Sequence, residues 1–221
     1  MQKDYFTELD DTDICFVIWS QEKNKEILEL TINSWLKVAE SLNLKIYVVT
    51  DDVTSRYEKI LYKQDCWQVE WSNSLTELKN RGYTNIISIL DDFLLTSLPS
   101  SIDEIKAVLK AFYENQWTYL SLVPHPNAIS IFGYENNPKV NDCYKVEKTW
   151  KYRNSLQVSV WNIEHMLKVV EKSKNIWFFE DAITGVEGYY CVSYKLLNYR
   201  HIVEKGFDNL RSTPSYVSIK K

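Results

Sequence analysis

The sequence of 221 residues has little glycine and little proline, five of each. No segment is rich in glycine, proline or serine, as a linker between two domains would be, and we find no internal repeat and no low-complexity segment. The length fits one α/β domain, which is long enough to bury a sizeable core. We therefore predict a single domain with two functional halves, residues about 1–126 and about 127–221.

Basic segments and closely spaced cysteines are also missing. The formal net charge is −4 and no basic block occurs, which disfavours sequence-independent binding to nucleic acid. The four cysteines are Cys15, Cys66, Cys143 and Cys191. No two of them form a C-x-x-C pair, which disfavours a zinc ribbon and a dense disulfide framework. A reducing cytoplasm is the location that we expect.

Long apolar runs are absent from the beginning of the chain. Residues 1–10 are too polar for a signal peptide, and the longest uninterrupted apolar run near them is Ile14–Trp19. That run is too short to cross a bilayer, which takes about 20 residues. Any contact with the inner face of a membrane is therefore expected to be peripheral.

Aromatic residues, in contrast, are abundant, with 8 Trp and 15 Tyr. Most of them are expected to pack in the core or at half-buried positions, because aromatic rings carry large apolar areas. A minority could offer ring faces on which a sugar or a base stacks.

The first half of the chain alternates predicted strands and helices. Apolar residues between Leu28 and Leu42 recur at spacings of four and three, which places them on one face of an amphipathic helix. Apolar strands precede and follow this helix, at Ile14–Trp19 and Lys45–Thr50, so parallel pairing of the two strands is expected. The next predicted elements are a short helix at Tyr57–Lys63, a half-buried strand at Trp67–Trp71, a helix at Ser72–Gly82, a strand at Ile86–Leu90, a helix after the capping box Ser101–Glu104 and a strand at Tyr119–Val123.

The character of the chain changes after Pro126. Shorter, aromatic-rich pieces replace the regular alternation, apart from a helical face at Ile163–Val170 and a strand at Tyr189–Tyr194. The strand and helix pattern as a whole predicts an α/β fold with a mostly parallel central sheet flanked by helices.

An acidic pair follows the strand predicted at Ile86–Leu90. Asp91 and Asp92 come where this strand should leave the core, and Asp is seldom buried without a partner. In one interpretation Asp91 starts a turn and Asp92 is solvated. In the other, the pair lies at the carboxyl edge of the sheet and holds a divalent cation against phosphates. The three histidines show no metal-ligand spacing, and we predict that none of them is a ligand.

Four features of the chain resemble the small GT-A-fold glycosyltransferases of bacterial capsule and O-antigen clusters. They are the opening strand Ile14–Ser20, the acidic segment Ile89–Leu95, the segment Tyr152–Gln157 leading to Trp161, and the segment Trp177–Glu180. The resemblance implies one GT-A, Rossmann-like domain. It also implies an enzyme that moves a sugar from a nucleotide-sugar donor to a glycan or a lipid-linked saccharide acceptor in surface polysaccharide biosynthesis.

The resemblance assigns donor binding to the first half, where Asp91 and Asp92 fall on the aspartate motif that meets the metal and the donor diphosphate. The common motif separates its aspartates by one residue, whereas here they are adjacent. We therefore expect one carboxylate, that of Asp92, to bind the ion, which would be Mn²⁺ or Mg²⁺. The implied donor-binding residues are Trp19, Ser20, Asp52, Asp91 and Asp92.

The second half would bind the acceptor. The implied acceptor-binding residues are Arg153, Asn154, Gln157 and Trp161. The first three offer directional hydrogen bonds to hydroxyls or phosphate, and the tryptophan offers a ring face. If no ion binds, Arg153, Lys205 or Arg211 must neutralise the charge on the diphosphate. Each of these three is otherwise an ordinary solvated surface charge.

Glu180 falls on the usual position of a catalytic acid residue in the family. The aromatic residues 177–179 before it would partly dehydrate its carboxyl and raise its pKa, which suits a general base in an inverting transfer. Asp181 is the rival base. A helix N-terminus beginning here would explain both acids through the helix dipole, without any catalysis.

Other classes of function stay open. A glycoside hydrolase also uses two carboxylates, although it needs no nucleotide-binding half. An aspartate-dependent phosphatase would carry its nucleophile on an early strand rather than in mid-chain. A non-catalytic glycan- or nucleotide-binding protein of the same fold fits the same residues, because a fold does not determine a function.

Overall fold

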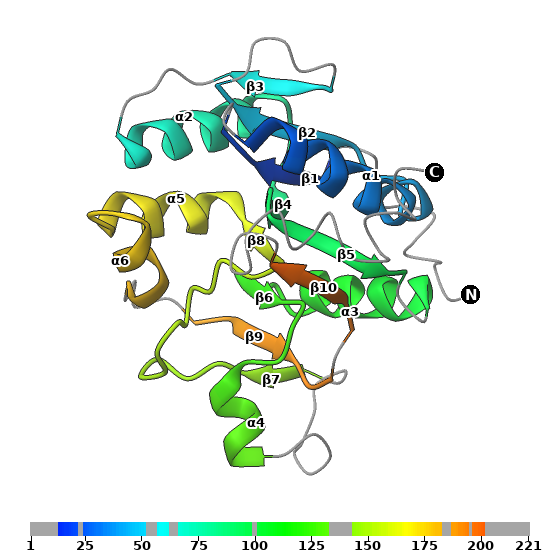
Figure 1. Ribbon diagram of the computed structural model, residues 1–221. Helices are drawn as coiled ribbons and strands as arrows, with labels where there is room; N and C mark the ends of the chain where they lie inside the picture. The colour runs from blue at the N-terminus through cyan, green and yellow to red at the C-terminus, as the bar shows by residue number, and fades with distance from the viewer. Residues whose placement is uncertain are drawn as a thin grey trace.

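A large mixed sheet forms the centre of the computed structural model, which describes residues 13–21, 24–51, 57–61, 66–98, 101–132, 143–182, 187–194 and 196–201 (Figure 1). Within these residues the sheet has eight strands, in the order β3-β2-β1-β4-β8-β6-β9-β7. In that order their bounds are Lys59–Leu61, Ile46–Thr50, Ile14–Trp19, Asn85–Leu90, Ser159–Asn162, Tyr119–Ser121, Tyr189–Val192 and Cys143–Lys145.

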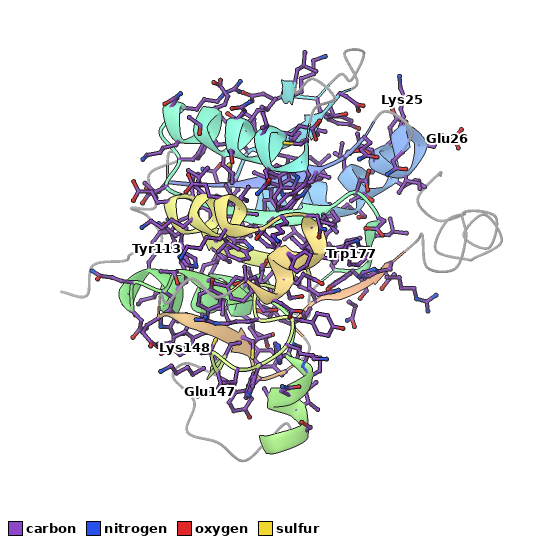
Figure 2. The ribbon with its side chains drawn as sticks, turned by 90° about the vertical axis from the view of Figure 1, so that its left-hand side faces the viewer. Lys25, Glu26, Tyr113, Glu147, Lys148 and Trp177 are labelled. Atoms are coloured by element: carbon purple, nitrogen blue, oxygen red, sulfur yellow. The ribbon has the colours of Figure 1, made fainter. Side chains whose placement is uncertain are left out.

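Helices cover both faces of this sheet (Figure 1). The first face carries α1 (Lys25–Ser41) and α3 (Ile102–Glu114), and the second carries α2 (Trp67–Asn80), α5 (Ile163–Lys172) and α6 (Ile176–Asp181). Figure 2 shows the second face turned toward the viewer. The short helix α4 (Pro126–Phe132) lies near the β7 end of the sheet (Figure 1). None of the helices in the described part of the chain is long and apolar enough to cross a membrane.

The central strand β1 is buried on both sides. Ile14, Phe16 and Ile18 pack in one apolar layer with α1 and α3, whereas the residues that alternate with them pack in the other layer with α2, α5 and α6. A strand with no solvated face needs apolar side chains at every position, which explains the uninterrupted apolar run in the sequence.

The pairing of the strands brings several strand ends to one edge. β1 pairs in parallel with β2 and β4, and β2 pairs in parallel with β3. β8 runs antiparallel to both β4 and β6, so β8 begins where those two strands end. A separate two-stranded antiparallel sheet of β5 (Phe93–Ser97) and β10 (Asn198–His201) follows β4 directly and pairs His201 with Phe93.

Most of the elements predicted from the sequence are confirmed, including the parallel pairing of β1 and β2 and the cap at Ser101, whose hydroxyl accepts from the Asp103 amide. The strand predicted at Trp67–Trp71 is wrong, because these residues form the first turn of α2. Trp67 and Trp71 are four residues apart and share a helix face, whereas Val69 between them is exposed. The helix predicted at Tyr57–Lys63 is also wrong, because Lys59–Leu61 pair with β2 as β3.

Candidate active site

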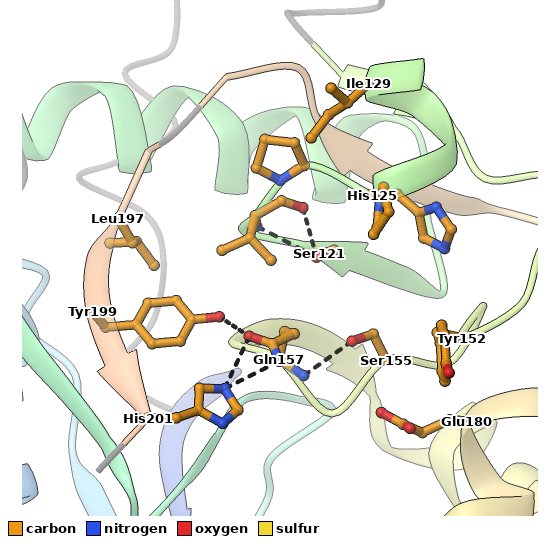
Figure 3. Close-up of a pocket in the computed structure, with 13 residues that line it drawn as sticks. Ser121, His125, Ile129, Tyr152, Ser155, Gln157, Glu180, Leu197, Tyr199 and His201 are labelled. Carbon is orange, nitrogen blue, oxygen red and sulfur yellow. Dashed lines mark hydrogen bonds between the residues drawn. The ribbon is translucent and has the colours of Figure 1, made fainter. Parts of the chain in front are cut away.

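Two cavities open at the edge where β1, β4 and β6 end. The first, which we call the aspartate cavity, has a volume of about 280 Å³ and is lined by Trp19, Ser20, Asn24, Trp71, Asp91 and Asp92 among others. The second, which we call the glutamate cavity, has a volume of about 560 Å³ and is lined by Tyr152, Ser155, Gln157, Glu180, Tyr199 and His201 among others (Figure 3). The carboxyl edge of a sheet in an α/β protein is where ligands usually bind.

Asp91 lines the aspartate cavity and accepts hydrogen bonds from residues of other segments. Its Oδ2 accepts a hydrogen bond of 2.7 Å from the Ser20 hydroxyl and one of 2.9 Å from the Asn24 amide. Its own backbone carbonyl accepts from the Thr31 hydroxyl at 2.5 Å. Burial raises the pKa of Asp91, and the two side-chain hydrogen bonds oppose that rise. Asp91 therefore links the end of β4 to the loop after β1 and to α1.

Asp92 also lines the aspartate cavity and lies next to a residue of the glutamate cavity. Its Oδ2 lies 4.0 Å from Nδ1 of His201, which pairs with Phe93 across β5 and β10 and packs on the Phe93 ring. The other ring nitrogen of His201 lies 3.2 Å from Nε2 of Gln157, in the glutamate cavity. The two cavities therefore meet at His201.

Trp19 closes one side of the aspartate cavity. Its ring stacks on the ring of Trp71, with centroids 4.1 Å apart and planes 15° from parallel, and its indole nitrogen donates to the Ser88 hydroxyl at 2.9 Å. Trp67 packs on Trp71 from the other side. The aromatic wall is thus fixed by ring contacts and by a hydrogen bond to β4.

The glutamate cavity has polar groups from three elements (Figure 3). Gln157, just before β8, accepts a hydrogen bond from the Tyr199 hydroxyl of β10 and contacts His201 of the same strand. Oε1 of Glu180, at the end of α6, accepts a hydrogen bond of 3.3 Å from the Leu156 amide. Burial raises the pKa of Glu180, and the nearby charge of Asp181 adds to that rise.

Glu180 and Asp181 have different surroundings. Glu180 lines the glutamate cavity, whereas Asp181 is exposed and its Oδ1 accepts a hydrogen bond of 2.9 Å from the Tyr152 amide. The alternative explanation through a helix N-terminus is wrong, because α6 begins at Ile176 and these two acids lie in its last two positions. The carboxyl end of a helix disfavours negative charge, so the helix dipole does not explain them.

Of the four residues predicted to bind the acceptor, only Gln157 lines the cavity. Trp161 is fully buried between Tyr119 and Phe179, so no face of its ring is available to a ligand. Arg153 is buried as well, with its guanidinium carbon 3.8 Å from the centre of the Tyr189 ring. The predictions for Trp161 and Arg153 as ligand-contacting residues are therefore corrected to packing within the core.

Asn154 is buried too, and its prediction as an acceptor-binding residue is corrected in the same way. Its side-chain amide donates to the backbone carbonyls of Phe179 at 2.8 Å and Ala182 at 2.7 Å. These bonds tie the loop before β8 to α6 and so fix where Glu180 lies.

Of the predicted donor-binding residues, Trp19, Ser20, Asp91 and Asp92 all line the aspartate cavity. Asp52, Lys205 and Arg211 lie outside the described residues. Tyr152 belongs to the segment expected on the acceptor side and lines the cavity, whereas Tyr199 and His201 were not predicted as cavity residues. The only available signal was the position of His201 at the end of a short polar strand, which is too common a feature to single it out.

No protein-family model and no curated protein matches this sequence. Among solved structures, residues 1–349 of S. aureus TarS match with a TM-score of 0.52 and 11% identity, over 85% of this chain and 59% of that chain. The same fragment in complex with UDP-GlcNAc matches with a TM-score of 0.51 and 14% identity, over 85% and 57%. A longer TarS structure matches with a TM-score of 0.51 and 11% identity, over 85% and 36%.

TarS is a glycosyltransferase with the GT-A fold. This chain has the GT-A fold. At this level of identity the likeness shows the fold alone, and the chain spans less than two thirds of the length of the TarS chains that it matches.

Asp92, which lines the aspartate cavity, and His201, which lines the glutamate cavity, each offer a ligand atom for a divalent cation. A cation lies about 2.0–2.3 Å from a carboxylate oxygen or an imidazole nitrogen, so the 4.0 Å between Asp92 Oδ2 and His201 Nδ1 suits one ion shared by both. Among the residues that the structure describes, no group of three or more His, Cys, Asp or Glu side chains could hold a metal. The Asp92 carboxylate suits Mg²⁺, which commonly binds through one or two carboxylates and completes its shell with substrate phosphates and water.

Proposed function

We propose that this chain is a glycosyltransferase that moves a sugar from a nucleotide-sugar donor to a saccharide acceptor. The donor would bind in the aspartate cavity and the acceptor in the glutamate cavity. One observation carries the proposal: Asp92, in the first cavity, and Glu180, in the second, lie at the same edge of a GT-A sheet, with His201 between the two cavities. A site for a leaving diphosphate and a site for a base are thus adjacent.

The leaving diphosphate needs positive charge nearby, because negative charge develops on its oxygens as the bond to the sugar breaks. Asp92 would hold a Mg²⁺ or Mn²⁺ ion, with His201 as a second ligand in place of the sequence-based prediction that no histidine is a ligand. The bound ion would act as a Lewis acid on phosphate oxygens. Asp91 would act indirectly, since its hydrogen bonds to Ser20 and Asn24 fix the loop that borders the diphosphate site.

Glu180 would be the general base. A sugar hydroxyl is a weak nucleophile, so its proton must pass to a base while its oxygen bonds to the anomeric carbon and the diphosphate departs. The raised pKa of Glu180 makes its carboxylate a stronger base than an exposed one, and its place in the cavity wall lets it meet a bound hydroxyl. Attack from the side opposite the diphosphate would invert the anomeric configuration.

The resemblance of the sequence motifs to capsule and O-antigen enzymes extends the proposal to a role in bacterial surface polysaccharide biosynthesis. The acceptor would then be a glycan or a lipid-linked saccharide, and contact with a membrane would be peripheral.

The function is tested by incubating the protein with UDP-, GDP-, dTDP- and CMP-sugars and measuring nucleotide release, with and without Mn²⁺. Release from one nucleotide class, lost in Asp92→Asn and in Glu180→Gln, is the expected result. Binding of a nucleotide without any release, with or without a panel of saccharide acceptors, would instead indicate a non-catalytic binding protein. Hydrolysis of glycosidic bonds without nucleotide would indicate a glycoside hydrolase.

A further inference from the structure

Three aromatic side chains of α6 and of the loop before β8 are unusually exposed. Trp177 is 77% exposed, Phe178 57% and Tyr152 53%, whereas Trp19, Trp35, Trp71, Trp117 and Trp161 are buried and Trp67 and Trp150 are half-buried. Figure 2 shows Trp177 on α6, on the face of the molecule turned to the viewer. Exposed aromatic rings grouped at one place commonly mark a binding surface.

The three rings belong to one rigid unit, made of α6 and the loop Tyr152–Asn154. The Tyr152 amide donates to Asp181 Oδ1 at 2.9 Å, and the Asn154 amide donates to the Glu180 carbonyl at 3.0 Å. The side chain of Asn154 adds bonds to the carbonyls of Phe179 and Ala182. Four hydrogen bonds to α6 and to the residue after it thus hold the loop in place.

Tyr152 adopts an unfavourable backbone conformation, with φ of 56°. The left-handed region is strained for a residue with a Cβ atom, and the hydrogen bond from the Tyr152 amide to Asp181 helps to hold the residue there. The result is a tyrosine ring placed at the wall of the glutamate cavity, on the same side of the view in Figure 3 as Glu180.

The unit is continuous with the cavity. Trp177, Glu180 and Asp181 are spaced by three and four residues, so they share one face of α6. Glu180 and Tyr152 line the cavity, and Asp181 bonds to Tyr152. A ligand that leaves the cavity past Tyr152 therefore meets this face of α6.

The residue types suit a sugar chain. A pyranose ring has an apolar face of C–H groups, which packs on aromatic rings, and hydroxyls at its edge, which donate hydrogen bonds to carboxylates. The helix α6 carries two carboxylates and no basic residue, whereas an anionic membrane surface attracts lysine and arginine. Exposed basic residues do lie close to α6 in sequence, such as Lys174. Binding to an anionic lipid surface is therefore the alternative that the experiment must test.

We propose that Tyr152, Trp177 and Phe178 form a binding surface for the sugar units that follow the reacting unit of the acceptor. This rests on the proposed function in placing the acceptor hydroxyl in the glutamate cavity. The acceptor is then an oligosaccharide or polysaccharide chain, and a monosaccharide reaches only part of the site.

The test is an array of immobilised bacterial saccharide fragments, from one to about eight units long, probed with the wild-type protein and with Trp177→Ala and Phe178→Ala. Both side chains are largely exposed, so both variants should fold, which circular dichroism verifies. Leu36→Ala is the matched control, because Leu36 is an exposed apolar residue on α1, on the opposite face of the sheet. The expected result is binding that strengthens with fragment length in the wild type and the control, and a loss of roughly tenfold for long fragments in both variants.

Equal binding by the variants and the wild type, or no fragment bound better than a monosaccharide, would overturn the proposal. Vesicles of phosphatidylglycerol and phosphatidylethanolamine form a second arm. Binding to them that is lost in Trp177→Ala, without length-dependent saccharide binding, would overturn it in favour of a membrane surface. The array measures no transfer and contains no nucleotide, so its outcome is independent of whether the chain releases nucleotide from a sugar donor.

Discussion

His201 Nδ1 lies 4.0 Å from the Asp92 carboxylate, although Asp92 lies in the turn between β4 and β5 and His201 lies at the end of β10. Pairing of β5 with β10 brings them together, since His201 is opposite Phe93, the residue after Asp92. The opposite side of the same imidazole contacts Gln157. His201 therefore lines the glutamate cavity and contacts a residue of the aspartate cavity, and it is the natural place to begin testing the site.

Replacing either member of this pair should weaken binding of a nucleotide together with Mn²⁺. We expect Asp92→Asn and His201→Ala to raise the Kd for the matching nucleoside diphosphate by roughly tenfold or more in calorimetry, about 1.4 kcal/mol. Asp91→Ala should mainly lower the melting temperature, because it leaves the Ser20 and Asn24 donors without their shared acceptor. Unchanged nucleotide and metal affinity in both Asp92→Asn and His201→Ala would remove the metal site from the proposal.

The substitution Glu180→Gln keeps the shape of the side chain and removes its basicity. We expect turnover to fall by roughly a hundredfold or more while donor binding persists. Asp181→Asn is the matched control, because its carboxylate bonds to the Tyr152 amide rather than lining the cavity. A large loss in Asp181→Asn with little loss in Glu180→Gln would make Asp181 the base, and no loss in either would end the inverting mechanism proposed here.

The rate of transfer should depend on pH through Glu180. A general base works only when deprotonated, and burial raises the pKa of Glu180 above its ordinary value of about 4.3. Activity is therefore expected to fall as the pH drops through a value above 4.3, and the profile of kcat/KM against pH reports that value. An acidic limb at or below about 4.3 would show that a carboxyl without a raised pKa controls the reaction.

His165 should make the stability of the protein depend on pH. It is buried in α5 and hydrogen-bonded to the Tyr189 hydroxyl, and burial, with the charges of Arg153 and Lys168, lowers its pKa to about 4. An unfolded histidine has a pKa of about 6.5, so between these values the unfolded chain binds more protons and stability falls as the pH is lowered. Urea unfolding from pH 7 to 4 should therefore show a shallower loss in His165→Gln than in the wild type.

Trp161 should matter for stability and not for the acceptor. Because its ring is fully buried, Trp161→Ala is expected to cost about 3–5 kcal/mol of unfolding free energy. The milder Trp161→Phe should fold and keep the KM for an acceptor close to that of the wild type. A KM raised tenfold in a folded Trp161→Phe protein would show that the ring does reach the acceptor.

Much of the donor side could be predicted from the sequence. A continuous apolar run predicted β1, and a run that is apolar except for Ser88 predicted β4, because a strand buried on both faces is mostly apolar. Residues that follow such a strand lie at one edge of the sheet, which is why Asp91 and Asp92 were expected there, and the resemblance to GT-A enzymes added Ser20. The structure places all three around the aspartate cavity.

Which of the acceptor-side candidates line the glutamate cavity could not be predicted from the sequence, because their burial depends on packing against distant segments. Arg153, Asn154 and Trp161 have the side chains that bind sugars in many proteins, and here all three are buried by packing against α6, Tyr189 and Phe179. Periodicity cannot separate a tryptophan on a cavity wall from one in the core, since both are apolar positions on a strand.

The sequence by itself determined the α/β layers, the order of most strands and helices, and the acidic pair at the end of β4, because local periodicity and strand burial depend on neighbouring residues. Only the tertiary structure decided that His201 and Tyr199 join Gln157, across 44 and 42 residues of chain, and that Glu180 rather than Asp181 lines the cavity. These contacts depend on the pairing of β10 with β5 and on the packing of α6. Both are determined by the burial of apolar residues throughout the core, which no local stretch of sequence specifies.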